Sequence, residues 1–175
     1  MRCFLACNFS PESKKLIGQA ADTVKKKINE KKIRWVAQEN YHLTMVFFDE
    51  VSEPRAQELS ALTGKALHGA VRNFKIFCQG INFFPRVLFL DIPDKQNISI
   101  IYEKIKFLDP QKNRKFIPHL TLARTVKNDF SLRQKSIIKN ITLPRLELEI
   151  TGISLMKSEF SRNGPVYSCL YTFRE

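Results

Sequence analysis

The apolar positions of the chain follow two different periods, and each period predicts one kind of element. Short runs rich in aromatic and β-branched residues are typical of strands, whereas longer segments with apolar positions three or four residues apart are typical of helices. Helices are predicted to open at Ser10 and at Ser52, and to cover residues 97–108. Strands are predicted over residues 2–9, 41–48, 74–84, 87–92, 119–124, 145–160 and 166–173, with a short extended piece at Trp35 and Val36.

The predicted elements follow the same order twice: strand, helix, strand. This order amounts to a weak internal repeat, and no low-complexity stretch or long linker interrupts it. A chain of 175 residues has the usual length of one domain. We therefore expect one domain over residues 1–175, built from two pseudo-symmetric lobes.

Composition indicates a folded protein with a substantial core. Hydrophobic residues make up 43% of the chain and include 14 Phe, so burial can offset the entropy lost on ordering. No apolar run approaches the roughly 20 residues that a membrane-spanning helix needs. The start Met1-Arg2-Cys3-Phe4 is too short and mixed for a signal peptide. These features predict a cytoplasmic protein that does not enter a membrane.

The charge balance favours polyanionic partners. The chain has 29 Lys and Arg against 17 Asp and Glu, a formal net charge of +12. Basic runs at Lys25–Lys27 and Lys31–Lys32 fall at a predicted helix end, where a merely solvated surface explains them equally well. Charge alone does not separate RNA from DNA or from an acidic membrane surface.

The cysteines do not predict a metal site. Cys3, Cys7, Cys78 and Cys169 form no CxxC pair and have no histidine at ligand spacing. Four residues of strand between Cys3 and Cys7 span roughly 13 Å, too far for a disulfide. We therefore expect these two side chains to be buried thiols in a reducing compartment.

Two of the three histidines open the same tripeptide, His42-Leu43-Thr44 and His119-Leu120-Thr121. The chance probability of this coincidence is on the order of 10⁻⁴ at usual residue abundances. Strand alternation places each histidine and its threonine on one face, about 7 Å apart, with apolar residues behind them. By the same alternation the opposite face would carry Leu43, Met45 and Phe47 in the first motif, and Leu120 and Leu122 in the second.

Two histidines and two hydroxyls without a metal suit in-line displacement at phosphorus. One neutral imidazole accepts a proton from the attacking oxygen, and a protonated one donates to the departing oxygen. Threonine hydroxyls can bind the non-bridging oxygens. One alternative is that the histidines only pack in a core or at a strand edge. The other is a metal site, but no carboxylate stands at ligand spacing from either motif, and Asp49 and Glu50 lie beyond the predicted strand. His68, at a predicted helix end beside Gly69, is expected to be a surface residue.

These motifs and their surroundings resemble the two-histidine (2H) phosphoesterase superfamily, most closely its RNA 2′,3′-cyclic phosphodiesterases, once called 2′-5′ RNA ligases. The resemblance covers nearly the whole chain and includes Arg2-x-Phe4-x-Ala6, Trp35-Val36, residues 39–45, Gly80–Phe83, Pro85–Leu88, residues 116–124, Ser158 and Gly164-Pro165-x-Tyr167. It implies an α+β, bilobal fold with two antiparallel sheets, helices on their outer faces and a central cleft.

The resemblance also implies roles for the motif residues. His42 would donate a proton to the leaving oxygen, His119 would accept one from water, and Thr44 and Thr121 would hold the phosphate. The implied reaction opens a terminal 2′,3′-cyclic phosphate to a 2′-phosphomonoester, with 2′-5′ joining as a minor activity. No cofactor and no metal are implied, and we expect a monomer whose partners are RNA ends or small cyclic-phosphate nucleotides.

Three further residues are singled out by the resemblance. It places Arg124 near the phosphate, although strict alternation puts this side chain opposite His119, so a bulge or strand end would have to turn it; a surface salt bridge is the alternative. Phe4 could stack a terminal base, but core packing is the favoured interpretation. Asp49 stands where relatives commonly have Gly, in a turn that can require positive φ.

Two other functions remain open from the sequence. The first is a 2′-5′ phosphodiesterase or ligase that acts on tRNA fragments or oligonucleotides with the same site. The second is an RNA-binding module that has kept the fold without turnover, although a pure binder has no need of two titratable groups on matched strands.

Overall fold

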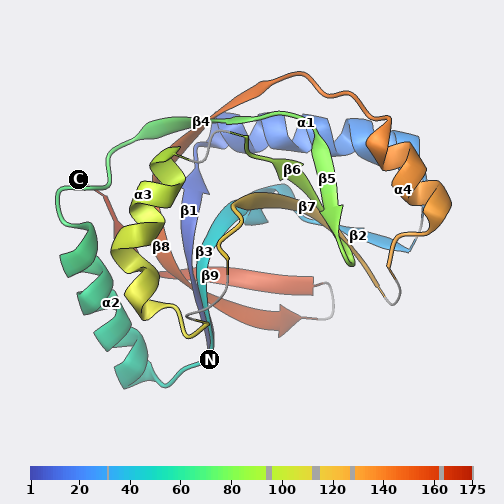
Figure 1. The fold of residues 1–175 in the computed structure, drawn as a ribbon. Coiled ribbons are helices and arrows are strands. Elements are labelled where there is room, and N and C mark those ends of the chain that lie inside the picture. Colours follow the sequence, from blue (N-terminus) through green and yellow to red (C-terminus); the bar gives the residue numbers. More distant parts are fainter. Residues whose placement is uncertain (31, 94–95, 112–114, 127–128, 162–163, 175) are drawn as a thin grey trace.

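The computed structural model describes residues 1–30, 32–93, 96–111, 115–126, 129–161 and 164–174 (Figure 1). The described strands are β1 Arg2–Phe9, β2 Ile33–Trp35, β3 His42–Glu50, β4 Phe74–Cys78, β5 Ile81–Phe84, β6 Val87–Asp91, β7 His119–Thr125, β8 Leu146–Ser161 and β9 Gly164–Phe173. The helices are α1 Pro11–Ile28, α2 Glu53–Leu67, α3 Gln96–Ile105 and α4 Leu132–Lys139, with 3₁₀ turns at Gln38–Asn40 and Lys106–Leu108.

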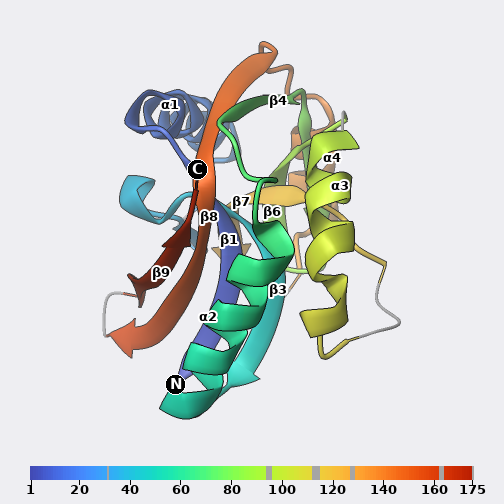
Figure 2. The same cartoon turned by 90° about the vertical axis from the view of Figure 1, so that its left-hand side faces the viewer.

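The strands form two antiparallel sheets, which confirms the predicted α+β class. One sheet has the order β3-β1-β8-β4, with β9 paired to β8, and the other has the order β2-β7-β6-β5. Figures 1 and 2 show α2 and α3 side by side at one end of the molecule and α1 along the top. The two sheets approach each other where β3, an edge strand, contacts β7. The two histidine strands are therefore neighbours in space.

The helix starts follow from capping residues that the sequence analysis recognised. The hydroxyl of Ser10 accepts a hydrogen bond from Ser13 N at 3.2 Å, and Ser52 does the same for Arg55 N at 3.4 Å. The helix α1 ends at Asn29, in the left-handed conformation with φ 45°. Lys25–Lys27 lie in its last turn, and Lys31 lies outside the described residues.

Two details of the predicted elements are wrong. The strand expected over residues 74–84 is two strands in different sheets, because Gly80 has φ 81° and redirects the chain between β4 and β5. The helix α4 was not predicted, although its capping box is present: Ser131 Oγ accepts from Gln134 N, and the Gln134 side chain accepts from Ser131 N. Between the strands predicted over residues 145–160 and 166–173, residues 162 and 163 lie outside the described part.

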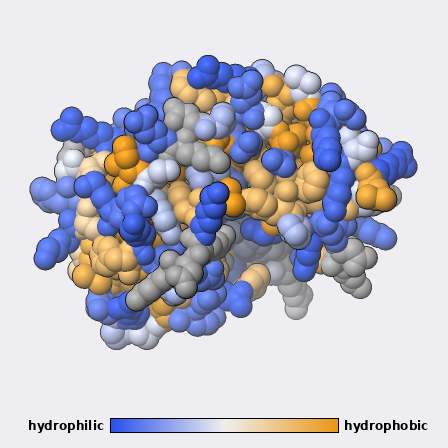
Figure 3. Space-filling view, viewed as in Figure 1, coloured by the Kyte–Doolittle hydropathy of each residue, from blue (hydrophilic) through white to orange (hydrophobic). Residues whose placement is uncertain are grey.

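A single core of buried side chains backs both histidine strands. Leu43 and Leu120, which follow the two histidines, are both 0% exposed, so each motif is anchored from behind. Cys3 and Cys7 are buried as expected, whereas Cys169 is exposed. In the described part of the chain, no helix is both long and apolar enough to cross a membrane. Figure 3 shows hydrophilic side chains around much of one face, with apolar patches between them.

Candidate active site

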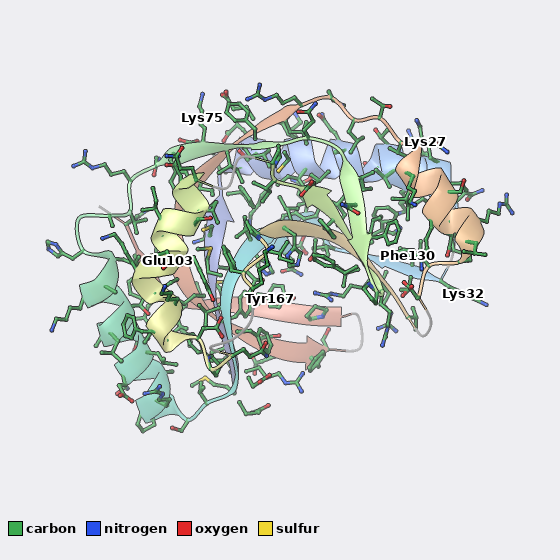
Figure 4. All side chains as sticks on the ribbon, in the orientation of Figure 1. Lys27, Lys32, Lys75, Glu103, Phe130 and Tyr167 are labelled. Carbon is green, nitrogen blue, oxygen red and sulfur yellow. The ribbon has the colours of Figure 1, made fainter. Side chains whose placement is uncertain are left out.

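The two histidine motifs open onto one shared cavity, in line with the central cleft that the family resemblance implied. The cavity has a volume of about 220 Å³. Its walls come from β1, β3, β7, β8 and β9 and from the segment before β3. The lining residues are Phe4, Val36, Asn40, His42, Thr44, Phe47, His119, Thr121, Arg124, Ser158 and Tyr167. Tyr167 is labelled near the centre of Figure 4.

The imidazole of His42 is fixed by two contacts. Its Nδ1 lies 2.7 Å from the carbonyl oxygen of Asn40, and its Nε2 lies 3.1 Å from Oγ1 of Thr44. A carbonyl oxygen only accepts, so Nδ1 carries a hydrogen and donates it. Nε2 is therefore the nitrogen that gains or loses a proton, and it does so beside a hydroxyl that can both donate and accept.

His119 is anchored in the same way. Its Nδ1 lies 2.8 Å from the carbonyl oxygen of Ile117, which precedes it by two residues just as Asn40 precedes His42. The carbonyl again requires the hydrogen on Nδ1, which leaves Nε2 for proton exchange. Two imidazoles on different sheets thus present the same ring nitrogen to one cavity, an arrangement suited to paired acid and base chemistry.

A bulge in β7 turns Arg124 toward the cavity. Ala123 pairs with Leu88 and Thr121 pairs with Phe89, so Leu122 is an extra residue in its strand. After this bulge, Arg124 lies on the same face as His119 and Thr121 instead of the opposite face. Strict alternation had placed Arg124 opposite His119, and the family pattern had placed it near the phosphate. The structure agrees with the family pattern in that Arg124 lines the cavity.

The same feature in β3 corrects the prediction for Phe47. Val46 pairs with Leu5 and Thr44 pairs with Ala6, so Met45 is the extra residue here. Phe47 therefore lines the cavity with His42, whereas strict alternation had placed it on the opposite face. Met45 and Val46 are consecutive buried residues, 3% and 1% exposed, a doublet that breaks the alternating pattern.

Aromatic rings surround both histidines. The ring centre of His42 lies 4.9 Å from that of Phe4 and 5.2 Å from that of Tyr167, whose ring is edge-on. The ring of His119 meets Phe84 at 5.2 Å and Phe89 at 5.3 Å, both edge-on. These rings pack against both imidazoles and limit the orientations that they can take.

Burial is the main electrostatic influence on His42. The pKa of His42 is lowered to about 4, chiefly by burial; the hydrogen bond to Asn40 opposes this shift, and the positive charges of Lys14 and Arg124 add to it. In the phosphate-free site His42 is therefore neutral at pH 7. Burial raises the pKa of Tyr167, and the nearby charge of Arg124 opposes that shift. The cavity thus combines a neutral imidazole with a fixed cation.

Some lining residues received no role from the sequence, among them Ser158, Tyr167 and Asn40. Ser158 and Tyr167 pair across β8 and β9, and this hairpin supplies one wall of the cavity. Asn40 joins that wall to the first motif, because its Nδ2 donates to the carbonyl oxygen of Pro165 at 3.2 Å. All three lie in segments that carry the family resemblance, but their positions depend on long-range strand pairing.

The remaining candidate residues lie as follows. Phe4 lines the cavity but is only 2% exposed, with its ring stacked near Phe47 and edge-on to Tyr167, so base stacking on it stays a prediction. His68 is exposed at the end of α2, as expected. Within the described ranges, no three His, Cys, Asp or Glu side chains cluster as metal ligands would.

The comparisons with known proteins agree with this fold. The profile of the 2′-5′ RNA ligase superfamily matches residues 12–161. The chain is 26% identical to the RNA 2′,3′-cyclic phosphodiesterase of Thermotoga maritima, over 98% of this chain and 94% of that protein. It is 30% identical to the protein of the same name from Methanocaldococcus jannaschii, over 97% and 98%.

A solved structure shows the same fold. The protein TT0787 of Thermus thermophilus superposes with a TM-score of 0.74 at 23% identity, covering 99% of this chain and 97% of that one. Two antiparallel sheets that bring two His-Leu-Thr motifs to one cavity define the class, that of the 2H phosphoesterases. The chain belongs to the 2′-5′ RNA ligase superfamily.

Proposed function

We propose that this protein hydrolyses the 2′,3′-cyclic phosphate at the end of an RNA to a 2′-phosphomonoester. The observation that carries the proposal is the pair of imidazoles, His42 and His119, held identically through Nδ1 at one cavity. The names of the relatives at 26% and 30% identity support the substrate class. Such a substrate must contain ribose, because the cyclic phosphate needs a 2′ oxygen.

The proposed step is an in-line displacement by water. Nε2 of neutral His119 accepts a proton from water while the water oxygen bonds to phosphorus. The bond from phosphorus to the 3′ oxygen breaks, and protonated His42 donates the Nε2 proton to that oxygen. The products are a 2′-phosphate and a 3′-hydroxyl, with water as the only other reactant.

Three side chains are proposed to hold the phosphate. Thr44, Thr121 and Arg124 line the same cavity as the two histidines. Each can donate a hydrogen bond to a non-bridging oxygen, where negative charge accumulates as the water attacks. Arg124 supplies the permanent charge, which makes its bonds to the phosphate the stronger ones.

The donor role of His42 requires a proton that the phosphate-free site does not favour, since its pKa there is about 4. A bound phosphodiester brings a negative charge next to the imidazole, and an adjacent opposite charge raises the pKa of a histidine. We infer that substrate binding and protonation of His42 are coupled. The proton would then be taken up as the substrate enters the cavity.

Joining of RNA ends is the second candidate, favoured by the description of the superfamily. It uses the same groups in the same roles, because a 5′-hydroxyl replaces water as the attacking group and the 3′ oxygen again leaves; cleavage of the resulting 2′-5′ bond is the reverse reaction. A third alternative is an RNA-binding module, which would bind RNA at the same cavity without catalysing a reaction.

The experiment that tests the proposal is turnover of a 2′,3′-cyclic mononucleotide and of an RNA with the same end, in EDTA, with the product analysed by ³¹P NMR. The expected product carries its phosphate on the 2′ oxygen. A 3′-phosphate, or activity that EDTA removes, would contradict the proposed step. Binding of the RNA without turnover would support the module, and joined products formed with an added 5′-hydroxyl RNA would support ligation.

A further inference from the structure

A second arginine lies directly beside Arg124 at the edge of the site. In the pairing of β2 with β7, Arg34 is the partner of Arg124, and residues directly opposite in a sheet project from the same face. Val36, two residues after Arg34, lines the cavity, which independently places Arg34 on the cavity side. The alternation agrees, because the intervening Trp35 pairs with the buried Ala123.

Two like charges in this position destabilise a sheet unless something compensates them. Among the ion pairs and hydrogen bonds of the described residues, neither Arg34 nor Arg124 is joined to a carboxylate. Both are exposed residues, and Arg124 lines the cavity. A bound anion is the natural counter-charge for such a pair.

We propose that Arg34 binds the phosphate on the 5′ side of the terminal nucleotide, next to the cyclic phosphate held at Arg124. This proposal rests on the proposed function, because it assigns the two guanidinium groups to two successive phosphates of one RNA strand. Paired strands lie about 5 Å apart, and the long arginine side chains extend beyond that spacing. One ribose separates its 2′,3′-phosphate from its 5′-phosphate, so both groups can be reached by neighbouring arginines.

The consequence is a preference for an RNA end over a free cyclic nucleotide. A 5′-hydroxyl mononucleotide would occupy the cavity and leave Arg34 unused, whereas any longer RNA would bring an internucleotide phosphate to it. The contact reads the backbone and not the base, so it would extend to RNA ends of any sequence.

The proposal is tested by titration calorimetry with adenosine 2′-monophosphate and adenosine 2′,5′-bisphosphate at one fixed salt concentration. Wild type is expected to bind the bisphosphate roughly tenfold tighter, the range for one charge-assisted contact. Arg34→Gln should remove that preference and leave the affinity for the monophosphate within about twofold. Arg34→Lys should keep part of the preference for the bisphosphate, because lysine retains the positive charge but lacks the planar set of N–H donors of a guanidinium.

Lys65→Gln is the matched control, because it removes the same charge from the exposed face of α2. It should leave both affinities unchanged. Arg34→Gln should also be at least as stable as wild type to thermal unfolding, since it relieves a like-charge pair. A loss of stability would indicate that Arg34 has a structural role instead.

Three results would overturn the role of Arg34: no preference for the bisphosphate in wild type, a preference that survives Arg34→Gln, or an equal loss of both ligands in that variant. Failure of the proposed function can be distinguished from failure of the role of Arg34. If wild type prefers the bisphosphate but turns over no cyclic phosphate, the second phosphate site stands and the hydrolytic activity does not.

Discussion

Phe47 and Arg124 occupy equivalent positions in the two halves of the site. Each follows its histidine by five residues, and each is turned toward the cavity by one extra residue in its strand, Met45 or Leu122. The two motifs are thus alike in backbone as well as in sequence. They differ in what the bulge presents, because the first half contributes an aromatic ring and the second a cation.

Arg124 is predicted to contribute to phosphate binding through its charge. Arg124→Gln should lower kcat/KM for a 2′,3′-cyclic nucleotide about 10- to 100-fold, the loss of one or two charge-assisted hydrogen bonds. Arg124→Lys should recover part of this activity. Steady-state kinetics at low and high salt measure the effect, and equal activity of Arg124→Gln and wild type would remove Arg124 from the site.

The ionisation of His42 is predicted to depend on the occupant of the cavity. Because burial lowers its pKa to about 4, the imidazole should stay neutral down to about pH 5 in the phosphate-free protein. Inorganic phosphate should raise that pKa, since an anion favours the protonated form. NMR titration of the ring signals with and without phosphate measures the shift. Titration near pH 6.5 in the free protein, unaffected by phosphate, would contradict this coupling.

Asp49 is predicted to tolerate glycine better than alanine. Its φ is 54°, the left-handed conformation that the departure from the common Gly suggested, and it follows a second irregularity in the pairing of β1 with β3. Asp49→Ala should lower the free energy of unfolding by about 1 kcal/mol, because an alanine Cβ is disfavoured there and Asp is less so. Asp49→Gly should stay within about 0.5 kcal/mol of wild type.

Urea unfolding of the two Asp49 variants measures this difference. Both should keep full activity, because Asp49 does not line the cavity. Equal destabilisation by alanine and glycine would show that the Asp side chain itself, and not its backbone conformation, matters at this position.

Thr125, the last residue of β7, is predicted to be replaceable by valine with a gain in stability. Its Oγ1 is buried and has no hydrogen-bond partner among the described residues. Removal of an unsatisfied buried hydroxyl should raise the free energy of unfolding by about 1 kcal/mol. Thr63→Val is the control, because the Thr63 hydroxyl donates to Leu59 O at 2.6 Å and its loss should destabilise. Destabilisation by Thr125→Val would mean that this hydroxyl is satisfied in solution.

The local part of the site could be predicted from the sequence, because it depends on short-range rules. Two identical tripeptides in strand-like segments were enough to place each histidine and its threonine on one face of a strand, and the structure brings both pairs to one cavity. The fold class was implied by the family resemblance, and the periodicities predicted most of its strands and helices. The left-handed turn at Asp49 was also anticipated, from its departure from the family pattern.

The parts that could not be predicted depend on interactions between distant segments. Strict alternation misplaced Phe47, since a bulge is defined by the partner strand and only the apolar doublet at Met45 and Val46 hinted at it. Tyr167 reaches the cavity because β9 pairs with β8 beyond β1, a choice of neighbour that no local pattern encodes. The register between Arg34 and Arg124 is of the same kind.

The most direct test of the account is the turnover of a 2′,3′-cyclic mononucleotide by single histidine variants in EDTA. His42→Ala and His119→Ala should each lower kcat by about 10²- to 10⁴-fold, the contribution of one acid or base. His68→Ala, which changes the exposed histidine at the end of α2, should leave kcat unchanged. Full activity in either cavity variant would contradict the shared role of the two imidazoles.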